Sequence, residues 1–384
     1  MIVMKFGGAV LREPDGFRRM VRILQAQPGH GTLVVVSAFA TATRDLEFAS
    51  RLAQKGLAAE ARERLDQVVA DHRTLLRALL PSATTREGME ALLDEARTAL
   101  TAVLDGVSTT RQLTPKTLDR ILAYGEFFAL HIARHVLQEA ELDVVGVDAQ
   151  TVIVTTADHG TASPLPEKTA IRVQHELLPA LSNHRIVLVQ GFVGRTEEGA
   201  TTTMGKESSN LTATLLGSLL EAQEVVIFTD VEGIRSADPH TTENTSIRPH
   251  LTYDQARVAA HHGLKLLYPT MIDPAAVSGL PIRIASAEHP NGESTIIDGA
   301  PGQCLPIVIA DHAGSDVEIT TVFIDCPQWL PAVTSVVLEL HSDTPCDVHT
   351  SHADRTAVLR VPAHVATDVV RRLHLQLSSQ DPKS

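Results

Sequence analysis

Short, continuously apolar runs recur along the chain, and each is followed by small or polar residues and then by helical periodicity. The runs span Ile2–Phe6, Thr32–Val36, Arg185–Val189 and Glu224–Phe228. Strands that are apolar on both faces are typical of a parallel sheet covered by helices on both sides. The pattern therefore predicts an α/β protein, and ligands of such proteins bind beyond the carboxyl ends of the strands.

Residues 45–106 interrupt this alternation. Leu, Ala, Arg and Glu dominate the segment, and apolar residues recur at helical spacing between Leu65 and Leu79. We expect a helical insertion here, a hairpin broken near Pro81–Thr85. It would pack as a helical layer, cover a site or form a dimer surface.

The composition changes again at residues 298–306, where glycine and proline predict a linker. Beyond the linker, the pattern predicts strands and two helices, one starting near Pro327 and one over Ala363–Leu373. The predicted strands are Val317–Ile324, Ser335–His341 and Thr356–Val361. This order resembles βαββαβ, so we predict a single small α+β module over 307–384.

Composition and charge narrow the class of partner. The 384 residues include 33 basic and 46 acidic side chains, a formal net charge of −13, and only 3% aromatic residues. The negative charge repels phosphate backbones and anionic lipids, and base stacking needs aromatic rings. We therefore expect no nucleic-acid partner and no membrane partner.

The cysteines and the amino terminus indicate a compartment. The three cysteines, Cys304, Cys326 and Cys346, are an odd and sparse set, which is typical of reduced thiols. The opening MIVMKFGG has no signal-peptide pattern, and no apolar run is long enough to cross a bilayer. We expect a cytoplasmic protein.

Three polar segments follow predicted strands. The first is Lys5-Phe6-Gly7-Gly8, where glycines let backbone N–H groups approach an anion and Lys5 would add a point charge. By itself this segment also fits an ordinary tight turn.

The second segment runs from Gly191 to Asn210 and precedes a predicted helix over Leu211–Leu220. Ser209 or Asn210 would cap that helix, whose first N–H groups would face a ligand. The third segment is Thr229–Ile234 with Ala237-Asp238-Pro239. Asp230 would position Lys5 or organise magnesium-bound water, whereas Asp238-Pro239 fits turn chemistry equally well.

Taken together, these segments resemble the aspartate kinase family within the amino-acid kinase superfamily, over residues 1–297. The resemblance also rests on Val35–Ala38 with Thr43, Gly125-Glu126, Thr201–Gly205, and Gly263–Lys265 with Pro269. It implies a three-layer αβα amino-acid-kinase fold with a mostly parallel central sheet, followed by one ACT-like α+β module in place of the usual two. A homodimer through that module is implied as well, with feedback control either reduced or assembled from two single modules.

The resemblance also implies the chemistry: phosphorylation of the β-carboxylate of L-aspartate by ATP, with Mg²⁺ on the ATP phosphates and no metal ligands from the protein. Such a reaction opens lysine, threonine and methionine biosynthesis. The residues implied for catalysis are Lys5 and Asp230. Those implied for the amino acid are Ser37, Thr43, Glu126, Lys206, Glu207, Ser209 and Asn210. Those implied for ATP are Lys5, Gly7, Gly8, Thr229, Asp230, Gly233, Asp238 and Lys265.

The absence of an obvious general base agrees with this chemistry. A side-chain carboxylate with a pKa near ~3.9 is already ionised at neutral pH, so no proton has to be removed. The remaining task is to offset repulsion between two anions, on the order of 4 kcal/mol for unit charges ~4 Å apart at an effective dielectric constant of ~20. Lys5, backbone amides and Mg²⁺ would do so.

One loop departs from the family. Lys206-Glu207-Ser208-Ser209-Asn210 stands where the family usually has Arg-Gly-Gly-Ser-Asp. Lysine keeps the positive charge but loses the bidentate fork of arginine, and we expect Glu207 partly to replace the missing aspartate. Two alternatives follow from this departure: a kinase for another amino-acid carboxylate, or an idle relative that binds an amino acid as a regulatory subunit.

Overall fold

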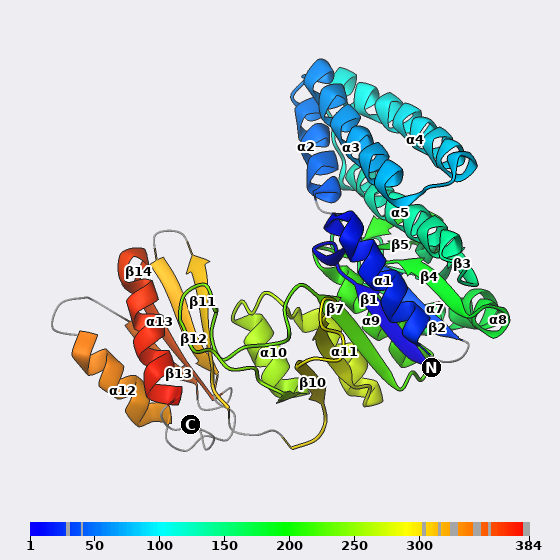
Figure 1. Ribbon diagram of the computed structural model, residues 1–384. Helices are drawn as coiled ribbons and strands as arrows, with labels where there is room; N and C mark the ends of the chain where they lie inside the picture. Colours follow the sequence, from blue (N-terminus) through cyan, green and yellow to red (C-terminus); the bar gives the residue numbers. More distant parts are fainter. Residues whose placement is uncertain are drawn as a thin grey trace. The chain divides into compact units, whose positions relative to one another are not determined.

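The structure, a computed structural model, describes residues 1–27, 31–39, 41–301, 305–313, 316–322, 329–340, 347–351 and 355–378. The chain folds into two compact units, Met1–Asp230 and Val231–Ser384 (Figure 1). The three cysteines, residues 302–304 of the expected linker and the expected helix start at Pro327 lie outside the described residues.

The first unit contains five parallel strands in the order β3-β4-β2-β1-β7. They are β1 (Ile2–Phe6), β2 (Thr32–Val36), β3 (Val144–Val147), β4 (Ile186–Gln190) and β7 (Glu224–Thr229). The four apolar runs therefore do form strands, and every residue of β2 and β4 is buried. Their carboxyl ends meet at one edge, which confirms the predicted α/β class.

Helices cover this sheet. Helix α5 (Pro115–Glu139) packs on β2, β3 and β4, and α9 (Ser208–Leu219) packs on β1, β2 and β7. Thr114 caps α5 by accepting a hydrogen bond from the Thr117 amide at 3.1 Å, and Pro115 occupies its first position. The remaining short helices of this part are η1 (Val10–Arg12), α1 (Pro14–Ala26), α6 (Ala149–Val152), α7 (Pro166–Arg172), η2 (Val173–Leu177) and α8 (Leu178–Asn183).

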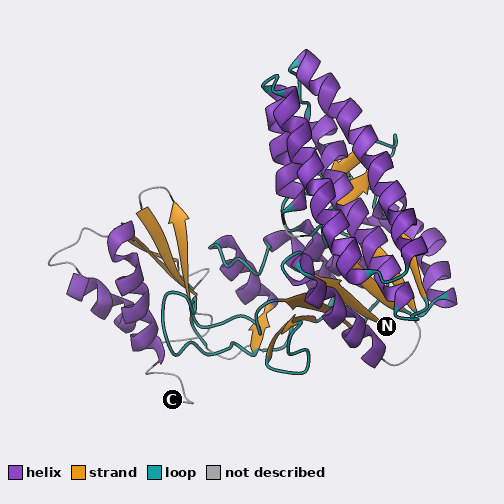
Figure 2. Ribbon diagram, turned by 45° about the horizontal axis from the view of Figure 1, so that its top comes forward, coloured by secondary structure: helices purple, strands orange, loops and turns teal. Residues whose placement is uncertain are grey.

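The segment that interrupts the alternation is helical. It forms α2 (Ala42–Gln54), α3 (Ala58–Leu79) and α4 (Ala83–Thr110), which pack on one another (Figure 2). The break falls where it is expected, since Ser82 caps α4 through the Thr85 amide. Three arginine–aspartate pairs join α3 to α4, but they are partly exposed and contribute little. Buried leucines such as Leu65, Leu76 and Leu100 hold the layer together.

The second unit contains two groups of paired strands. In the first, β10 (Ser294–Asp298) pairs antiparallel with β9 (Ile282–Ser286) and parallel with β8 (His250–Thr252), accompanied by α10 (Tyr253–His261) and α11 (Pro269–Ser278). The second is antiparallel, in the order β11-β12-β14-β13. Its elements are β11 (Ile307–Ala313), β12 (Asp316–Val322), α12 (Trp329–Leu340), β13 (Asp347–Ser351), β14 (Thr356–Pro362) and α13 (Ala363–Ser378).

This four-stranded module differs from the expected one in two ways. Residues 335–340 continue α12, so the predicted strand Ser335–His341 is wrong; a short apolar run fits a helix as well as a strand. The order along the chain is ββαββα, not βαββαβ. Read from β12, however, the elements run β-α-β-β-α, and β11 lies beside β12 as the fourth strand. The module is thus the expected set of elements with its last strand moved to the front.

The second unit has a continuous apolar core. Residues of β11, β12, β14, α12 and α13 form it, together with Ala237 from the segment that follows β7. Two polar contacts join the same parts: the Ser236 hydroxyl lies 2.9 Å from His374 Nε2, and Arg248 donates to the Pro306 carbonyl. Among the described residues, no helix has both the length and the apolar character that crossing a bilayer requires.

Candidate active site

Lys5 lies at the carboxyl end of β1, and its side chain is only 5% exposed. A Cβ at position 7 would lie 3.2 Å from Lys5 Nζ, so Gly7 leaves room for the ammonium group. Burial lowers the pKa of Lys5, and the negative charges of Glu207 and Glu126 act against that lowering. The sequence predicted a lysine at the end of this strand, and it also named Glu126 and Glu207; the structure shows that the charges of both carboxylates act on the lysine.

Glu126 lies in the middle of α5 and is 4% exposed. Burial raises its pKa to about 8; a backbone hydrogen bond from Ala38 and the charge of Lys5 act against this increase, whereas Glu207 adds to it. Its Oε2 atom is buried and has no hydrogen-bond partner among the described residues. A buried acceptor of this kind is costly unless a ligand supplies a donor.

Helix α9 brings the divergent loop to the same place. The helix begins at Ser208, three residues earlier than expected, so Ser209 and Asn210 lie in its first turn and the prediction that one of them caps it is wrong. Glu207 is the N-cap residue, in a left-handed conformation with φ 62° and without a side-chain cap. Lys206 and Glu207 are exposed, while Asn210 is buried with an unpartnered Oδ1 within the described chain.

The loop after β2 packs against α5. A Cβ on Gly125 would lie 3.3 Å from both the Ala38 Cβ and the Thr43 Oγ1, so the glycine permits this close approach. Ser37 and Thr43, on either side of this contact, are both half-buried. Two sequence-predicted substrate residues are therefore held next to Glu126.

The predicted nucleotide residues fall in both units. Gly7 and Gly8 follow β1; Thr229 and Asp230 end β7, beside β1, where the Thr229 hydroxyl donates to Asp230 at 3.0 Å. Gly233, Asp238 and Lys265 belong to the second unit, and their grouping with Lys5 stays a prediction.

Within that unit, Asp238 is exposed and accepts a hydrogen bond from the His240 amide, which is the turn geometry that Asp-Pro also predicted. Lys265 is exposed between α10 and α11.

Sequence reasoning missed two residues of the first unit. Asp119 is 1% exposed and accepts hydrogen bonds from Thr203, the Gly160 amide and His159. It thereby fixes β6 (Thr201–Thr203), which pairs with β5 (Val193–Arg195) and leads into the divergent loop. Phe192, between β4 and β5, has φ 70°, which is a strained conformation for a non-glycine residue. A single sequence reveals neither long-range contacts nor backbone strain.

The chemistry of these residues is suited to an anion at one point and to a cation at another. Lys5 and the glycines after β1 suit a phosphate group, and Glu126 suits an ammonium group. A divalent cation on such phosphates would neutralise their charge, and the exposed Asp230 carboxylate is the acidic group that β7 places at this edge. No group of three or more His, Cys, Asp or Glu side chains in the described part of the chain is placed to hold a metal ion.

A parallel α/β sheet with a buried lysine and a glycine pair at the end of its first strand places the chain among α/β proteins whose strand ends are suited to binding anionic groups. Comparison with known families gives the particular class: the model of the amino acid kinase family matches residues 1–286. The chain belongs to the amino acid kinase family.

Curated relatives are more specific. The chain is 30% identical over 297 residues to lysine-sensitive aspartokinase 3 of Escherichia coli (strain K12), which covers 77% of this chain and 64% of the relative. It is 27% identical to the chloroplastic aspartokinase 3 of Arabidopsis thaliana, over 77% of this chain and 52% of the relative. The chain thus spans between about half and two thirds of the length of these relatives.

A solved structure agrees in fold. The crystal structure of E. coli aspartokinase III in complex with aspartate and ADP superposes with a TM-score of 0.86, covering 98% of this chain and all of that one. At 21% sequence identity, this similarity establishes the fold. It confirms the expected α/β kinase fold with a small β-rich module at the carboxyl end.

The close packing between β4 and α9 generates a prediction. A Cβ on Gly191 would lie 2.5 Å from the Ser209 Cβ, so Gly191→Ala should lower the free energy of unfolding by about 2–3 kcal/mol. Gly88, within α4, has no atom within 4 Å of such a Cβ, so Gly88→Ala should raise stability by about 0.5–1 kcal/mol. Urea titrations of the full chain measure both, and equal effects of the two substitutions would contradict the close contact.

Proposed function

We propose that this protein is an aspartate kinase, which transfers the γ-phosphoryl group of ATP to the β-carboxylate of L-aspartate and forms 4-phospho-L-aspartate. The observation that carries the proposal is the buried Lys5 ammonium at the end of β1, with Glu126 and Glu207 acting on its charge. The aspartokinase relatives, and the aspartate and ADP in the similar solved structure, support the same assignment.

The roles of the side chains follow from their chemistry. The ammonium of Lys5 would lie against the transferred phosphoryl group and offset the repulsion between it and the incoming carboxylate. Glu126 would accept the substrate ammonium, since its Oε2 lacks a partner among the described residues. Lys206, at the start of the divergent loop, would attract the α-carboxylate as a point charge.

Nucleotide binding would involve Gly7, Gly8, Thr229 and Asp230 of the first unit and Gly233, Asp238 and Lys265 of the second. Mg²⁺ on the ATP phosphates would supply Lewis-acid stabilisation of the charge that develops during transfer. In the structure, Gly233 packs against β10: its φ is 142°, and a Cβ there would lie 2.7 Å from Thr295 Oγ1.

The proposal extends to assembly and location: a cytoplasmic homodimer that pairs through the ACT-like module 307–384. Strand β13 is at the edge of its sheet, and residues 347–350 are exposed. An exposed edge strand is a common surface for pairing between chains.

Substitution of the lysine tests catalysis. Lys5→Ala should lower kcat by at least ~10²-fold, because one preorganised positive charge is lost. Lys116→Ala, which removes an exposed lysine on α5, is the matched control and should leave kcat unchanged. ADP release and hydroxylamine trapping of the acyl phosphate, across a panel of amino acids, measure both variants.

The same panel separates the alternatives. Turnover with aspartate supports the proposal, and preferred turnover with another carboxylic amino acid would assign a different acceptor. Calorimetric binding of an amino acid without ADP release by the unsubstituted protein would favour the regulatory role. Full activity of Lys5→Ala would contradict the assigned mechanism.

The pKa of Glu126 predicts a pH dependence. With a pKa of about 8, Glu126 is protonated below pH 8, and it must ionise before it can pair with an ammonium group. The amino-acid KM should therefore fall as the pH rises toward 8, by up to about tenfold per pH unit. Glu126→Gln should raise KM and flatten this profile, while Glu139→Gln, at the end of the same helix, should preserve it. A profile that is unchanged in Glu126→Gln would refute the role.

The divergent loop predicts a smaller effect. Glu207→Gln should raise the amino-acid KM by about three- to tenfold, because an exposed charge contributes on the order of 1 kcal/mol. Glu197→Gln, an exposed position after β5, serves as the control. Steady-state kinetics at saturating ATP measures both, and an unaltered KM in Glu207→Gln would exclude Glu207 as the substitute carboxylate.

A further inference from the structure

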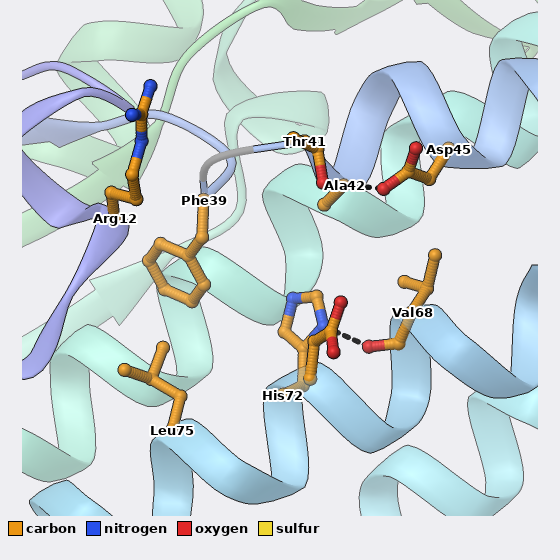
Figure 3. A pocket seen from close by; sticks show the side chains of 9 residues that line it. Arg12, Phe39, Thr41, Ala42, Asp45, Val68, His72 and Leu75 are labelled. Carbon is orange, nitrogen blue, oxygen red and sulfur yellow. Dashed lines mark hydrogen bonds between the residues drawn. The ribbon is translucent and has the colours of Figure 1, made fainter.

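Two buried histidines differ in what they hold together. His72, on α3, is 4% exposed, and its Nδ1 lies 2.6 Å from the carbonyl oxygen of Val68, four residues earlier in the same helix (Figure 3). His374, on α13, is 6% exposed, and its Nε2 lies 2.9 Å from the hydroxyl of Ser236, which is 138 residues earlier in the chain. The first contact is local to one helix. The second joins two distant segments of the second unit, the last helix and the chain that follows β7.

The segment bonded to His374 leads to Asp238, one of the residues proposed to bind the nucleotide. Ser236 lies two positions earlier and is 1% exposed. Its backbone is held as well, since the Val308 amide of β11 donates a hydrogen bond to the Ser236 carbonyl oxygen at 2.8 Å. Ala237, the residue in between, belongs to the apolar core of the four-stranded module. A strand and a helix of the module therefore both hold the chain just before Asp238.

Helix α13 also holds the chain just after Asp238. Arg371, one turn before His374, donates through Nε to the carbonyl oxygen of Thr241 at 2.9 Å. Between these two contacts, the amides of Thr241 and Thr242 donate to the Asp238 carbonyl oxygen at 3.0 and 3.1 Å and close a turn. Residues three positions apart lie on one face of a helix, so a single face of α13 bonds both sides of this turn.

The histidine acts through hydrogen bonding and not through charge. Burial, and then the positive charge of Arg248, lowers the pKa of His374, which keeps its ring neutral. The Ser236 Oγ accepts a hydrogen bond from the Ser246 amide at 3.0 Å, so its own proton is available to His374 Nε2. The Ser378 hydroxyl, one turn later on α13, lies farther from the same nitrogen, at 3.3 Å. A buried hydroxyl that loses its partner is costly, so the segment would have to move to satisfy it.

We propose that His374 is a positioning residue for nucleotide binding. Its hydrogen bond to Ser236, together with that of Arg371 to Thr241, holds the turn at Asp238 in the conformation that receives ATP. The module then contributes to nucleotide affinity through its own helix, without any bound effector. This inference rests on the proposed function, which assigns Asp238 to the nucleotide.

Substitutions of the histidine test this role. His374→Phe keeps an aromatic ring and removes the hydrogen bond, so it should raise the KM for ATP by about three- to tenfold while kcat and the amino-acid KM stay within about twofold. His374→Gln keeps a side-chain amide that can bond Ser236, so it should restore most of the affinity. His364→Phe, at an exposed position near the start of α13, is the matched control and should change none of these constants.

Two neighbouring arginines give a second matched pair. Arg371→Ala should raise the KM for ATP by about two- to threefold, a smaller effect, because its hydrogen bond to Thr241 is exposed to water. Arg372→Ala removes the same charge from the next position of α13, where the side chain pairs with Glu339 and Asp368. It should leave the KM for ATP unchanged.

Calorimetric titration of each full-length variant with ADP and Mg²⁺ measures nucleotide affinity without turnover. The Kd for ADP should rise by about the same factor as the KM for ATP. Ser236→Ala removes the same hydrogen bond and keeps the histidine, so it should match His374→Phe, and it carries the test if that variant does not fold. The double variant should bind ADP no more weakly than either single variant.

An unchanged Kd for ADP in folded His374→Phe and Ser236→Ala would overturn the inference, even if thermal unfolding shows lower stability, because the contact would then be structural only. Equal effects of His364→Phe and His374→Phe would overturn it as well. ADP binding by the unsubstituted protein without turnover of aspartate would contradict the proposed function alone, and the Kd values would still test the role of His374. No ADP binding by the unsubstituted protein would contradict both.

Discussion

The candidate site depends on a cation and two carboxylates that the fold brings together at the end of β1. Lys5 is buried in a place that favours its neutral form, and Glu126 is buried in a place that favours protonation. Glu207 and then Glu126 act against the lowering of the Lys5 pKa, whereas the Ala38 amide and then Lys5 act against the raising of the Glu126 pKa. Such a balance would shift when an anion binds at Lys5 and an ammonium group binds at Glu126, because each new charge favours the ionised form of the group that it meets.

The rest of the first unit holds those three charges in place. Parallel strands carry Lys5 to the same edge as the ends of β2, β4 and β7. Two glycines permit the contacts that side chains would block: Gly125 between α5 and the loop after β2, and Gly191 between β4 and α9. Asp119, on α5, fixes β6 through Thr203, so the helix that carries Glu126 also positions the loop that carries Glu207. Packing and charge thus reinforce one another.

Much of this was predictable because apolar runs and glycine pairs are local signals. The four strands and Lys5 with Gly7 follow from such patterns, as do the helical layer and the resemblance to a family. The predictions that were wrong concern features that depend on contacts between distant parts of the chain. Helix α9 starts at Ser208 because Glu207 adopts a left-handed conformation. Helix α12 stands where a strand was predicted, since a short apolar run fits either element. Asp119 is a single polar residue whose role depends on partners 40 and 84 residues away in the sequence.

The backbone conformation of Glu207 helps to explain the sequence of the divergent loop. In the family that the chain resembles, glycine usually occupies this position, and glycine adopts a positive φ without strain. Glutamate at φ 62° costs about 1–2 kcal/mol relative to glycine. Its side chain gives no helix cap in return, but it adds a negative charge that acts on Lys5 and Glu126. Because Glu207 is strained and its side chain caps no helix, we infer that its negative charge is the feature that matters in this loop. We therefore propose that the asparagine at position 210 and Glu207 belong to one change relative to the family, in which the carboxylate lies at the N-cap of α9 and not in its first turn.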